Sequence, residues 1–192
     1  FLSLQANRSI LLLDRDGVLL VPMPKREYVT NLLQYQPLIK NWIGLRDLSL
    51  AGFDFIVATN QPGVATGAVS EEFLNRLHRK MVSELMEFGI NVLAVYVCPH
   101  HWEANCDCRK PKTLLGEKAK SDFGVNIEKS YYVGDQESDM EFGKKLGCKV
   151  VQLVGNSGFS PLADKHSASL TEVAEWIIQD SIKGKSNDGT SE

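Results

Sequence analysis

The chain has 192 residues, 43% of them hydrophobic, with 21 Lys and Arg residues against 24 Asp and Glu residues. This length suits one domain with a full hydrophobic core, and the interspersed charges form no basic stripe, which argues against a nucleic-acid partner. No apolar run approaches the roughly 20 residues that a membrane helix needs, and residues 1–9 lack the pattern of a signal peptide, so we expect a soluble, cytoplasmic protein.

Short apolar runs alternate with longer amphipathic stretches along the chain. The runs predict strands at residues 10–14, 54–59, 92–98, 130–134 and 149–154, and the stretches predict helices at 37–51, 70–88, 114–123, 138–146 and 170–182. This alternation is typical of a parallel sheet covered by helices. We therefore predict an α/β fold, a doubly wound, Rossmann-like parallel sheet with helices on both faces.

The helix predicted at 70–88 carries the clearest local signals. Ser70 can cap its start, while Glu71 and Glu72 favour the positive end of the helix dipole. Its apolar residues recur at helical spacing, namely Phe73, Leu74, Leu77, Met81, Leu85 and Phe88. We interpret this stripe as a core face rather than as a ligand site.

The domain organisation follows from the spacing of these elements. The segment between Gly17 and the second strand has room for about one helix, so we expect a capless protein with a shallow site. Residues 183–192 are rich in Lys, Ser, Gly, Asn and Asp, which bury too little apolar area to order a segment. We predict a single domain over residues 1–182, a flexible C-terminal tail over 183–192, and a monomer.

Polar residues follow three of the predicted strands. These residues are Asp14-Arg15-Asp16-Gly17, Thr59-Asn60-Gln61 and Gly134-Asp135. In an open parallel sheet, ligands bind beyond the carboxyl ends of the strands, so we expect the three sets to meet in one crevice. The alternative is that D-x-D-G is a turn with incidental acids. The order of all three motifs along the chain favours a functional site.

The acids predict a magnesium-assisted attack on phosphorus. We expect the carboxylates of Asp14 and Asp16 to lie on one side of the extended chain, where a divalent cation shared with Asp135 would relieve their repulsion. Asp14 can then attack a phosphate, while Asp16 protonates the departing oxygen and later activates water. The hydroxyl of Thr59 can hold phosphate oxygens, and Lys110 or Arg109 can stabilise the charge of the transferring group.

Three of the four cysteines lie close together and predict a metal site. Cys98, His100, Cys106 and Cys108 match the Cys₃His composition of structural zinc, and His101 could replace His100. Four protein ligands leave no open position for water, so the zinc would be structural. Free surface thiols or a redox pair are the alternatives. The fourth cysteine, Cys148, is predicted to be an inert core residue.

The residues after the last cysteine are basic. Arg109 and Lys110 follow Cys108 directly, so a zinc-bound loop would fix both cations for phosphate capture. The alternative is a merely solvated basic loop. His78 and His166 have no partner pattern and are predicted to be ordinary surface or packing residues.

Together these motifs resemble the haloacid dehalogenase superfamily of phosphatases, and within it the small, zinc-containing, capless enzymes that act on heptose 1,7-bisphosphate or histidinol phosphate. The resemblance covers about residues 10–178. It is carried by Asp14-Arg15-Asp16-Gly17, Thr59-Asn60-Gln61-Pro62-Gly63, Cys98-Pro99-His100-His101, Cys106-Asp107-Cys108-Arg109-Lys110-Pro111, and Gly134-Asp135 with Asp139.

The resemblance implies a role for each matching residue. Asp14 would be the nucleophile, Asp16 the acid/base, Thr59 a phosphate ligand and Lys110 the stabilising cation. Magnesium would be held by Asp14, the Asp16 backbone carbonyl and Asp135, and zinc by Cys98, His100, Cys106 and Cys108. The substrate contacts would be Thr59, Asn60, Gln61, Arg109 and Lys110, and Asp139 would orient Lys110 or the metal ligands.

The departures from the family pattern lie around the substrate. Thr66 and Gln136 stand where heptose bisphosphatases usually carry basic residues, which weakens a site for a second phosphate. The first functional hypothesis is hydrolysis of D-glycero-D-manno-heptose 1,7-bisphosphate or a similar sugar phosphate. The second is a phosphatase for histidinol phosphate or another small metabolite. A third, from another class, is a zinc-stabilised, non-catalytic binding module.

Overall fold

Alternating residues of the central strands are buried on two opposite faces of one sheet. In the computed structural model, which describes residues 9–155 and 158–187, the strands are β1 (Ile10–Leu13), β2 (Asp54–Asn60), β3 (Val92–Cys98), β4 (Tyr131–Gly134), β5 (Lys149–Leu153) and β6 (Lys165–Ser167). Leu11 and Leu13 of β1 pack in one apolar cluster, and Ile10 and Leu12 pack in the other. This burial on both faces is what a parallel sheet covered by helices requires.

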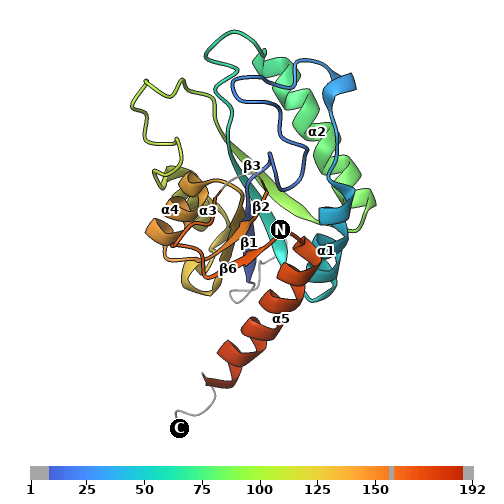
Figure 1. Cartoon of the computed structure of the whole chain (residues 1–192), viewed down its shortest axis with the longest axis vertical. Coiled ribbons are helices and arrows are strands. Elements are labelled where there is room, and N and C mark those ends of the chain that lie inside the picture. Colours follow the sequence, from blue (N-terminus) through green and yellow to red (C-terminus); the bar gives the residue numbers. More distant parts are fainter. Residues whose placement is uncertain (1–8, 156–157, 188–192) are drawn as a thin grey trace.

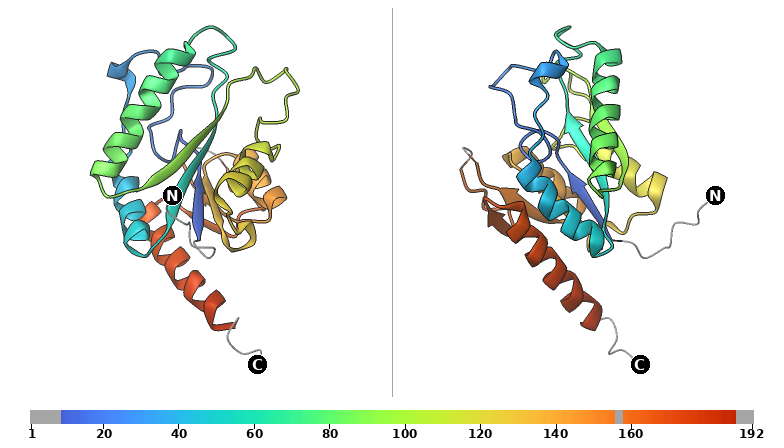
Figure 2. Two further views of the ribbon diagram at one scale, coloured as in Figure 1. Left: turned by 180° about the vertical axis from the view of Figure 1, so that it is seen from behind. Right: turned by 90° about the vertical axis from the view of Figure 1, so that its right-hand side faces the viewer.

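The helices divide between these two faces (Figure 1). They are α1 (Ile39–Leu50), α2 (Glu71–Glu87), α3 (Leu114–Phe123), α4 (Glu137–Leu146) and α5 (Leu170–Asn187), with short 3₁₀ turns η1 (Leu32–Gln34) and η2 (Ile127–Lys129). Core residues of α1, α2 and α5 share one apolar cluster, and those of α3 and α4 share the other. Views from behind and from the side show the same layers (Figure 2).

The strand order places the ends of β1 and β4 side by side. All six strands are parallel in the order β3-β2-β1-β4-β5-β6, which confirms the predicted doubly wound sheet. The chain runs outward in opposite directions from the β1–β4 pair, and such a switch point opens a crevice beyond the strands' carboxyl ends. Asp14 and Asp135 follow directly after these two strands.

Local patterns in the sequence predicted most of the helices and strands correctly. The Ser70 side chain accepts a hydrogen bond from Phe73 N at 3.1 Å, as a capping residue should, and Leu74, Leu77, Met81 and Leu85 are buried. Cys148 is buried as predicted, and burial raises its pKa to about 12. The prediction missed β6, because its three residues, Lys-His-Ser, carry no apolar alternation.

The end of the last helix corrects the predicted tail. α5 continues to Asn187, beyond the predicted end at residue 182, and residues 188–192 of the predicted tail lie outside the described residues. Residues 1–8 also lie outside the described residues. They make up most of the segment 1–9 that was predicted to lack a signal peptide. None of the helices described has the length and apolar composition needed to cross a bilayer.

Candidate active site and metal centre

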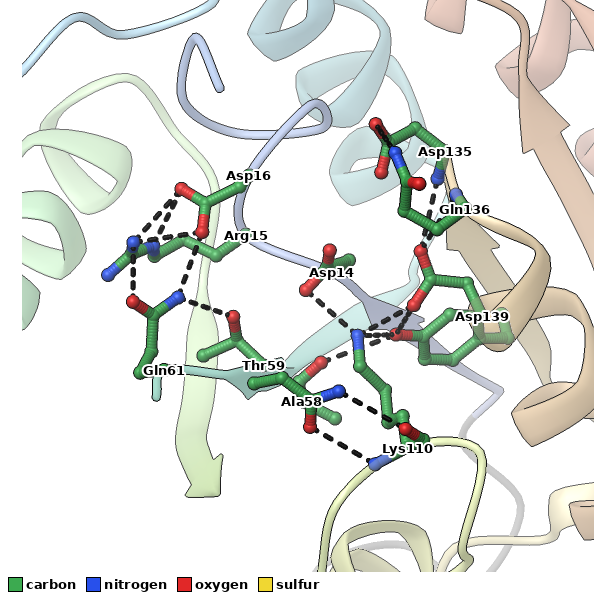
Figure 3. A network of polar contacts seen from close by, with 12 residues as sticks. Asp14, Arg15, Asp16, Ala58, Thr59, Gln61, Lys110, Asp135, Gln136 and Asp139 are labelled. Atoms are coloured by element: carbon green, nitrogen blue, oxygen red, sulfur yellow. Dashed lines mark hydrogen bonds and ion pairs between the residues drawn. The ribbon is translucent and has the colours of Figure 1, made fainter. Parts of the chain in front are cut away.

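Lys110 joins two carboxylates at the β1–β4 crevice. Its Nζ lies 2.9 Å from Asp14 Oδ1 and 2.7 Å from Asp139 Oδ1, and its side chain is only 2% exposed. The hydroxyl of Tyr132 is a third partner, 2.7 Å from the same Nζ. Figure 3 shows the ammonium between the carboxylates of Asp14 and Asp139. The pKa of Lys110 is raised even though burial acts to lower it, because Asp139 and Asp14 stabilise the charge.

Three acids form the wall of this crevice. Carboxylate oxygens of Asp14, Asp135 and Asp139 all lie within 4.8 Å of one another. Burial raises the pKa of Asp14 to about 7 and that of Asp135 to about 6. Among the described residues, the one hydrogen-bond donor recorded at the Asp135 carboxylate is Gln136 Nε2, at 2.8 Å. Two buried acids and one half-buried acid, with one ammonium beside them, fit a bound divalent cation.

Asp139 was predicted only to orient Lys110 or the metal ligands, but its carboxylate is itself one of the three in the acid cluster. Its Oδ2 accepts hydrogen bonds from the backbone N–H groups of Asp135 and Gln136, at 3.2 and 3.1 Å. The bond from Gln136 N belongs to the capping box that begins α4. Its predicted role in orienting Lys110 is consistent with the 2.7 Å contact to Nζ.

The carboxylate of Asp16 is not one of the three that lie within 4.8 Å of one another at this crevice. Its oxygens accept hydrogen bonds from Arg15 and Gln61 (Figure 3). β1 ends at Leu13, so Asp16 lies beyond the regular alternation of the strand. The loop then bends at Gly17, whose φ of +80° is left-handed. A Cβ at Gly17 would also lie 2.5 Å from Asp135 Oδ2, so only glycine fits there.

The last two residues of β2 and the residue that follows it hydrogen-bond to other groups of the site. Thr59 is buried, and its Oγ1 accepts a hydrogen bond from Gln61 Nε2 at 2.9 Å. The Asn60 side chain holds the backbone of Lys110 through two hydrogen bonds of 3.0 and 3.2 Å. The amides of Asn60 and Gln61, predicted as substrate contacts, are therefore both bound to the protein itself.

The side chains of Arg109 and Lys110 lie in different surroundings. The predicted alternative, a solvated basic loop, does not describe Lys110, because its side chain is buried between acids. Arg109 is half-buried, and its Nη1 is buried without a hydrogen-bond partner in the described part of the chain. A buried N–H that lacks an acceptor is costly to stability.

The predicted metal ligands after β3 come together in one cluster. Ligand atoms of Cys98, His100, Cys106 and Cys108 all lie within 4.8 Å of one another. The Cys106 sulfur is 3.6 Å from that of Cys98 and 3.7 Å from that of Cys108. Tetrahedral zinc with Zn–S bonds of about 2.3 Å places its sulfur ligands about 3.8 Å apart. The geometry thus fits zinc.

The structure also chooses between the two histidines. His100 Nδ1 lies 3.1 Å from Cys108 Sγ, whereas His101 accepts a hydrogen bond from Glu103 N and stacks on Trp102. His100 is therefore the histidine of the cluster. Cys106 and Cys108 precede Lys110 by only a few residues, so this cluster and Asn60 hold the lysine loop from two sides.

Two buried residues of the site gave no signal in the sequence. Tyr132 reads as an ordinary strand residue, and His78 as a packing residue on α2. His78 Nε2 lies 3.1 Å from Arg15 Nη1, so it is buried with a specific partner. His166, on β6, lies 2.8 Å from the carbonyl oxygen of Ser160 and takes no part in the site.

Comparisons with known proteins agree with this geometry. A family model described as HAD-hydrolase-like matches residues 107–177. The D-glycero-beta-D-manno-heptose-1,7-bisphosphate 7-phosphatase of Pseudomonas aeruginosa is 32% identical over 156 residues, which are 81% of this chain and 86% of that protein. The histidine biosynthesis bifunctional protein HisB of Campylobacter jejuni subsp. doylei is 35% identical over 144 residues, 74% of this chain but only 41% of HisB.

A solved structure shares both the fold and part of the sequence. The D,D-heptose 1,7-bisphosphate phosphatase of B. bronchiseptica, complexed with magnesium and phosphate, is 27% identical, with a TM-score of 0.80 over 90% of this chain and 99% of that one. The sheet order, the strand-end acids and these relatives lead to one conclusion. The chain belongs to the haloacid dehalogenase-like phosphatases and is a phosphoric monoester hydrolase.

Proposed function

We propose that this enzyme is a magnesium-dependent phosphomonoesterase that forms an aspartyl-phosphate on Asp14. The observation that carries the proposal is the placement of Lys110 between Asp14 and Asp139, beside Asp135. The side chains of Asp14 and Asp135 and the backbone carbonyl of Asp16 would hold magnesium. When bound, the ion neutralises the phosphate that the acids would otherwise repel.

The protein's own groups can perform two displacements. An Asp14 oxygen attacks phosphorus as the bond to the substrate's alcohol oxygen breaks, and that oxygen takes a proton from Asp16. Water then gives a proton to Asp16 and attacks the same phosphorus, which releases inorganic phosphate and restores the Asp14 carboxylate. Thr59 and Lys110 stabilise the transferring group, and Arg109 offers its unpaired Nη1 to the substrate.

A cavity beside this crevice supports a substrate with a second anionic group. Its volume is about 750 Å³, and Gly17, Asp135 and Gln136 line the wall nearest the acids. Lys25 and Lys40 line it as well. They supply positive charge that Thr66 and Gln136 do not. The relatives' substrates then point to heptose 1,7-bisphosphate or a similar sugar phosphate, because histidinol phosphate would bring an ammonium group toward two lysines.

Phosphate release tests the proposed substrate directly. With magnesium present, we expect the enzyme to release phosphate from heptose 1,7-bisphosphate faster than from histidinol phosphate or from sugar monophosphates. Colorimetric phosphate assays over such a panel measure this order. Faster turnover of histidinol phosphate would support the second candidate, which the 35% identity to HisB favours. Binding without turnover of any ester would instead indicate a non-catalytic, zinc-stabilised module.

The two cavity lysines should act on substrate binding. We expect Lys25→Met or Lys40→Met to raise KM for the bisphosphate roughly tenfold, because each removes a charge-assisted contact of about 1.5 kcal/mol. The rate with p-nitrophenyl phosphate, which has no second anionic group, should be unchanged. Lys118→Met, on the exposed side of α3, is the matched control. An unchanged KM in both lysine variants would exclude this anion site.

We also propose that Cys98, His100, Cys106 and Cys108 hold a structural zinc ion. Cys106→Ser should abolish zinc retention and lower both the melting temperature and phosphate release, because the cluster fixes the loop that carries Lys110. Metal analysis of the purified protein gives the zinc content. His101→Ala is the control and should keep its zinc, since that ring faces Glu103 and Trp102. Loss of zinc from this control would contradict the assignment.

A further inference from the structure

The guanidinium of Arg15 is buried beneath the loop that carries the two catalytic acids. Its Nε and Nη2 donate to Asp16 at 2.9 to 3.1 Å, and Nη2 also donates to Gln61 Oε1 at 2.8 Å. Its Nη1 lies 3.1 Å from His78 Nε2. Arg15 is only 3% exposed. With its donors engaged and its side chain covered, Arg15 is not a ligand for the substrate's phosphate.

Asp16 is held from two directions by this arrangement. The planar fork of Arg15 contacts both carboxylate oxygens, and Gln61 Nε2 donates to Oδ2 at 2.9 Å (Figure 3). A bidentate, charge-assisted contact fixes the direction of a carboxylate more tightly than a single bond. The Gln61 amide also donates to Thr59 Oγ1. The proposed acid/base and the proposed phosphate ligand therefore share one hydrogen-bond network.

His78 supports Arg15 from helix α2. Burial first, and then the neighbouring Arg15, lower the pKa of His78 to about 3, so the ring is neutral and Nε2 can accept a hydrogen bond from Nη1. Val97 on β3 and Val82 on α2 line the same surface groove as His78, together with polar side chains such as Asn75 and Ser83. Within the described residues, His78 Nε2 is the acceptor recorded for Arg15 Nη1. Losing the imidazole would leave a buried N–H of Arg15 without its partner.

From this geometry we propose that Arg15 is a positioning residue for Asp16, and that His78 holds Arg15 in place. The inference rests on the proposed function of Asp16 as acid/base. Aligned proton transfer contributes about 10²- to 10⁴-fold to a rate, so a carboxylate that can rotate freely loses much of that factor. The loss depends on the leaving group, because an alkoxide needs a proton to depart and p-nitrophenolate does not.

Rapid-mixing experiments with two esters separate positioning from general damage to the fold. For Arg15→Met, we expect formation of the phosphoenzyme from heptose 1,7-bisphosphate to slow by about 10²-fold. The first burst of p-nitrophenolate from p-nitrophenyl phosphate should change less than about threefold, since its departure draws no proton from Asp16. Steady-state turnover of both esters should fall, because Asp16 also activates water.

Two substitutions of His78 test whether its hydrogen bond to Arg15 matters. We expect His78→Phe to slow the bisphosphate step by about tenfold, as expected for roughly 1.4 kcal/mol. His78→Gln, whose Oε1 can still accept from Arg15, should restore most of the rate. Arg15→Lys keeps the charge but not the fork, and it should behave like Arg15→Met. It serves as the second variant if Arg15→Met does not fold.

Two results would overturn the proposal. One is an equal slowing of phosphoenzyme formation from both esters in folded Arg15 variants, and the other is a rate of phosphoenzyme formation from the bisphosphate in His78→Phe that matches the wild type. Failure of the proposed function gives a different result, because the wild-type enzyme itself would then form no phosphoenzyme from either ester. Melting temperatures of all variants are measured alongside, so that loss of fold is distinguished from loss of alignment.

Discussion

Asp14→Asn should lower phosphate release by on the order of 10⁴-fold or more, because a carboxamide cannot form the phosphoryl bond that the proposed mechanism requires. The substitution keeps the side chain's size and position after β1. It also removes a buried negative charge that is costly enough to raise the Asp14 pKa to about 7. We therefore expect the variant to fold, which allows its activity to be interpreted.

Two measurements define this result. Colorimetric phosphate release gives the loss of turnover, and intact-protein mass spectrometry after rapid acid quenching should detect one added phosphoryl group on wild type and none on Asp14→Asn. Asp122→Asn, which changes an exposed acid on α3 paired with Tyr96, should match wild type. Wild-type turnover in Asp14→Asn would exclude the covalent route.

Lys110→Met should both inactivate and destabilise the enzyme. The ammonium is the one cation that contacts Asp14 and Asp139 among the described side chains. Removing one partner of a buried ion pair costs about 3–5 kcal/mol, since the acids stay buried without compensation. We expect a loss of this size in the free energy of unfolding, and a turnover lower by on the order of 10³-fold, because charge on the transferring group is no longer stabilised.

A second substitution separates these two effects. In Lys110→Met with Asp139→Asn, one of the uncompensated carboxylates becomes neutral, so most of the lost stability should return while activity stays low. Urea unfolding in the presence of a chelator measures stability without any bound divalent cation. An unchanged urea midpoint in Lys110→Met would show that the lysine is not the counter-charge of this cluster.

Much of the site could be predicted because its residues stand at the ends of recognisable strands. An acid after Ile10–Leu13, a threonine near the end of β2 and Gly134-Asp135 after β4 must meet at one edge if the strands are parallel. The members of the Cys-His cluster were also identifiable, since four soft or borderline side chains lie within a few residues of one another. Both predictions depend only on residue type and on the order of nearby residues along the chain.

Other features depended on contacts between distant segments. The direction of Asp16 is set by Gln61, 45 positions away, and that of Arg15 by His78, 63 positions away. The placement of Asp139 in the acid cluster follows from the capping box of α4 and from Lys110, 29 positions away. Tyr132 resembles any strand aromatic until the lysine is brought to its hydroxyl. Strand alternation could not predict these directions.

The amino-acid sequence by itself determined five of the six strands, that they are parallel and covered on both faces, and which chemical groups stand at their carboxyl ends. Hydrophobic periodicity and residue type are sufficient for that, because they act over a few neighbouring residues. Only the tertiary structure decided which acids share the crevice, which histidine joins the cysteines, and where Asp16 points. Side-chain direction is set by hydrogen bonds and ion pairs to partners that folding alone brings near.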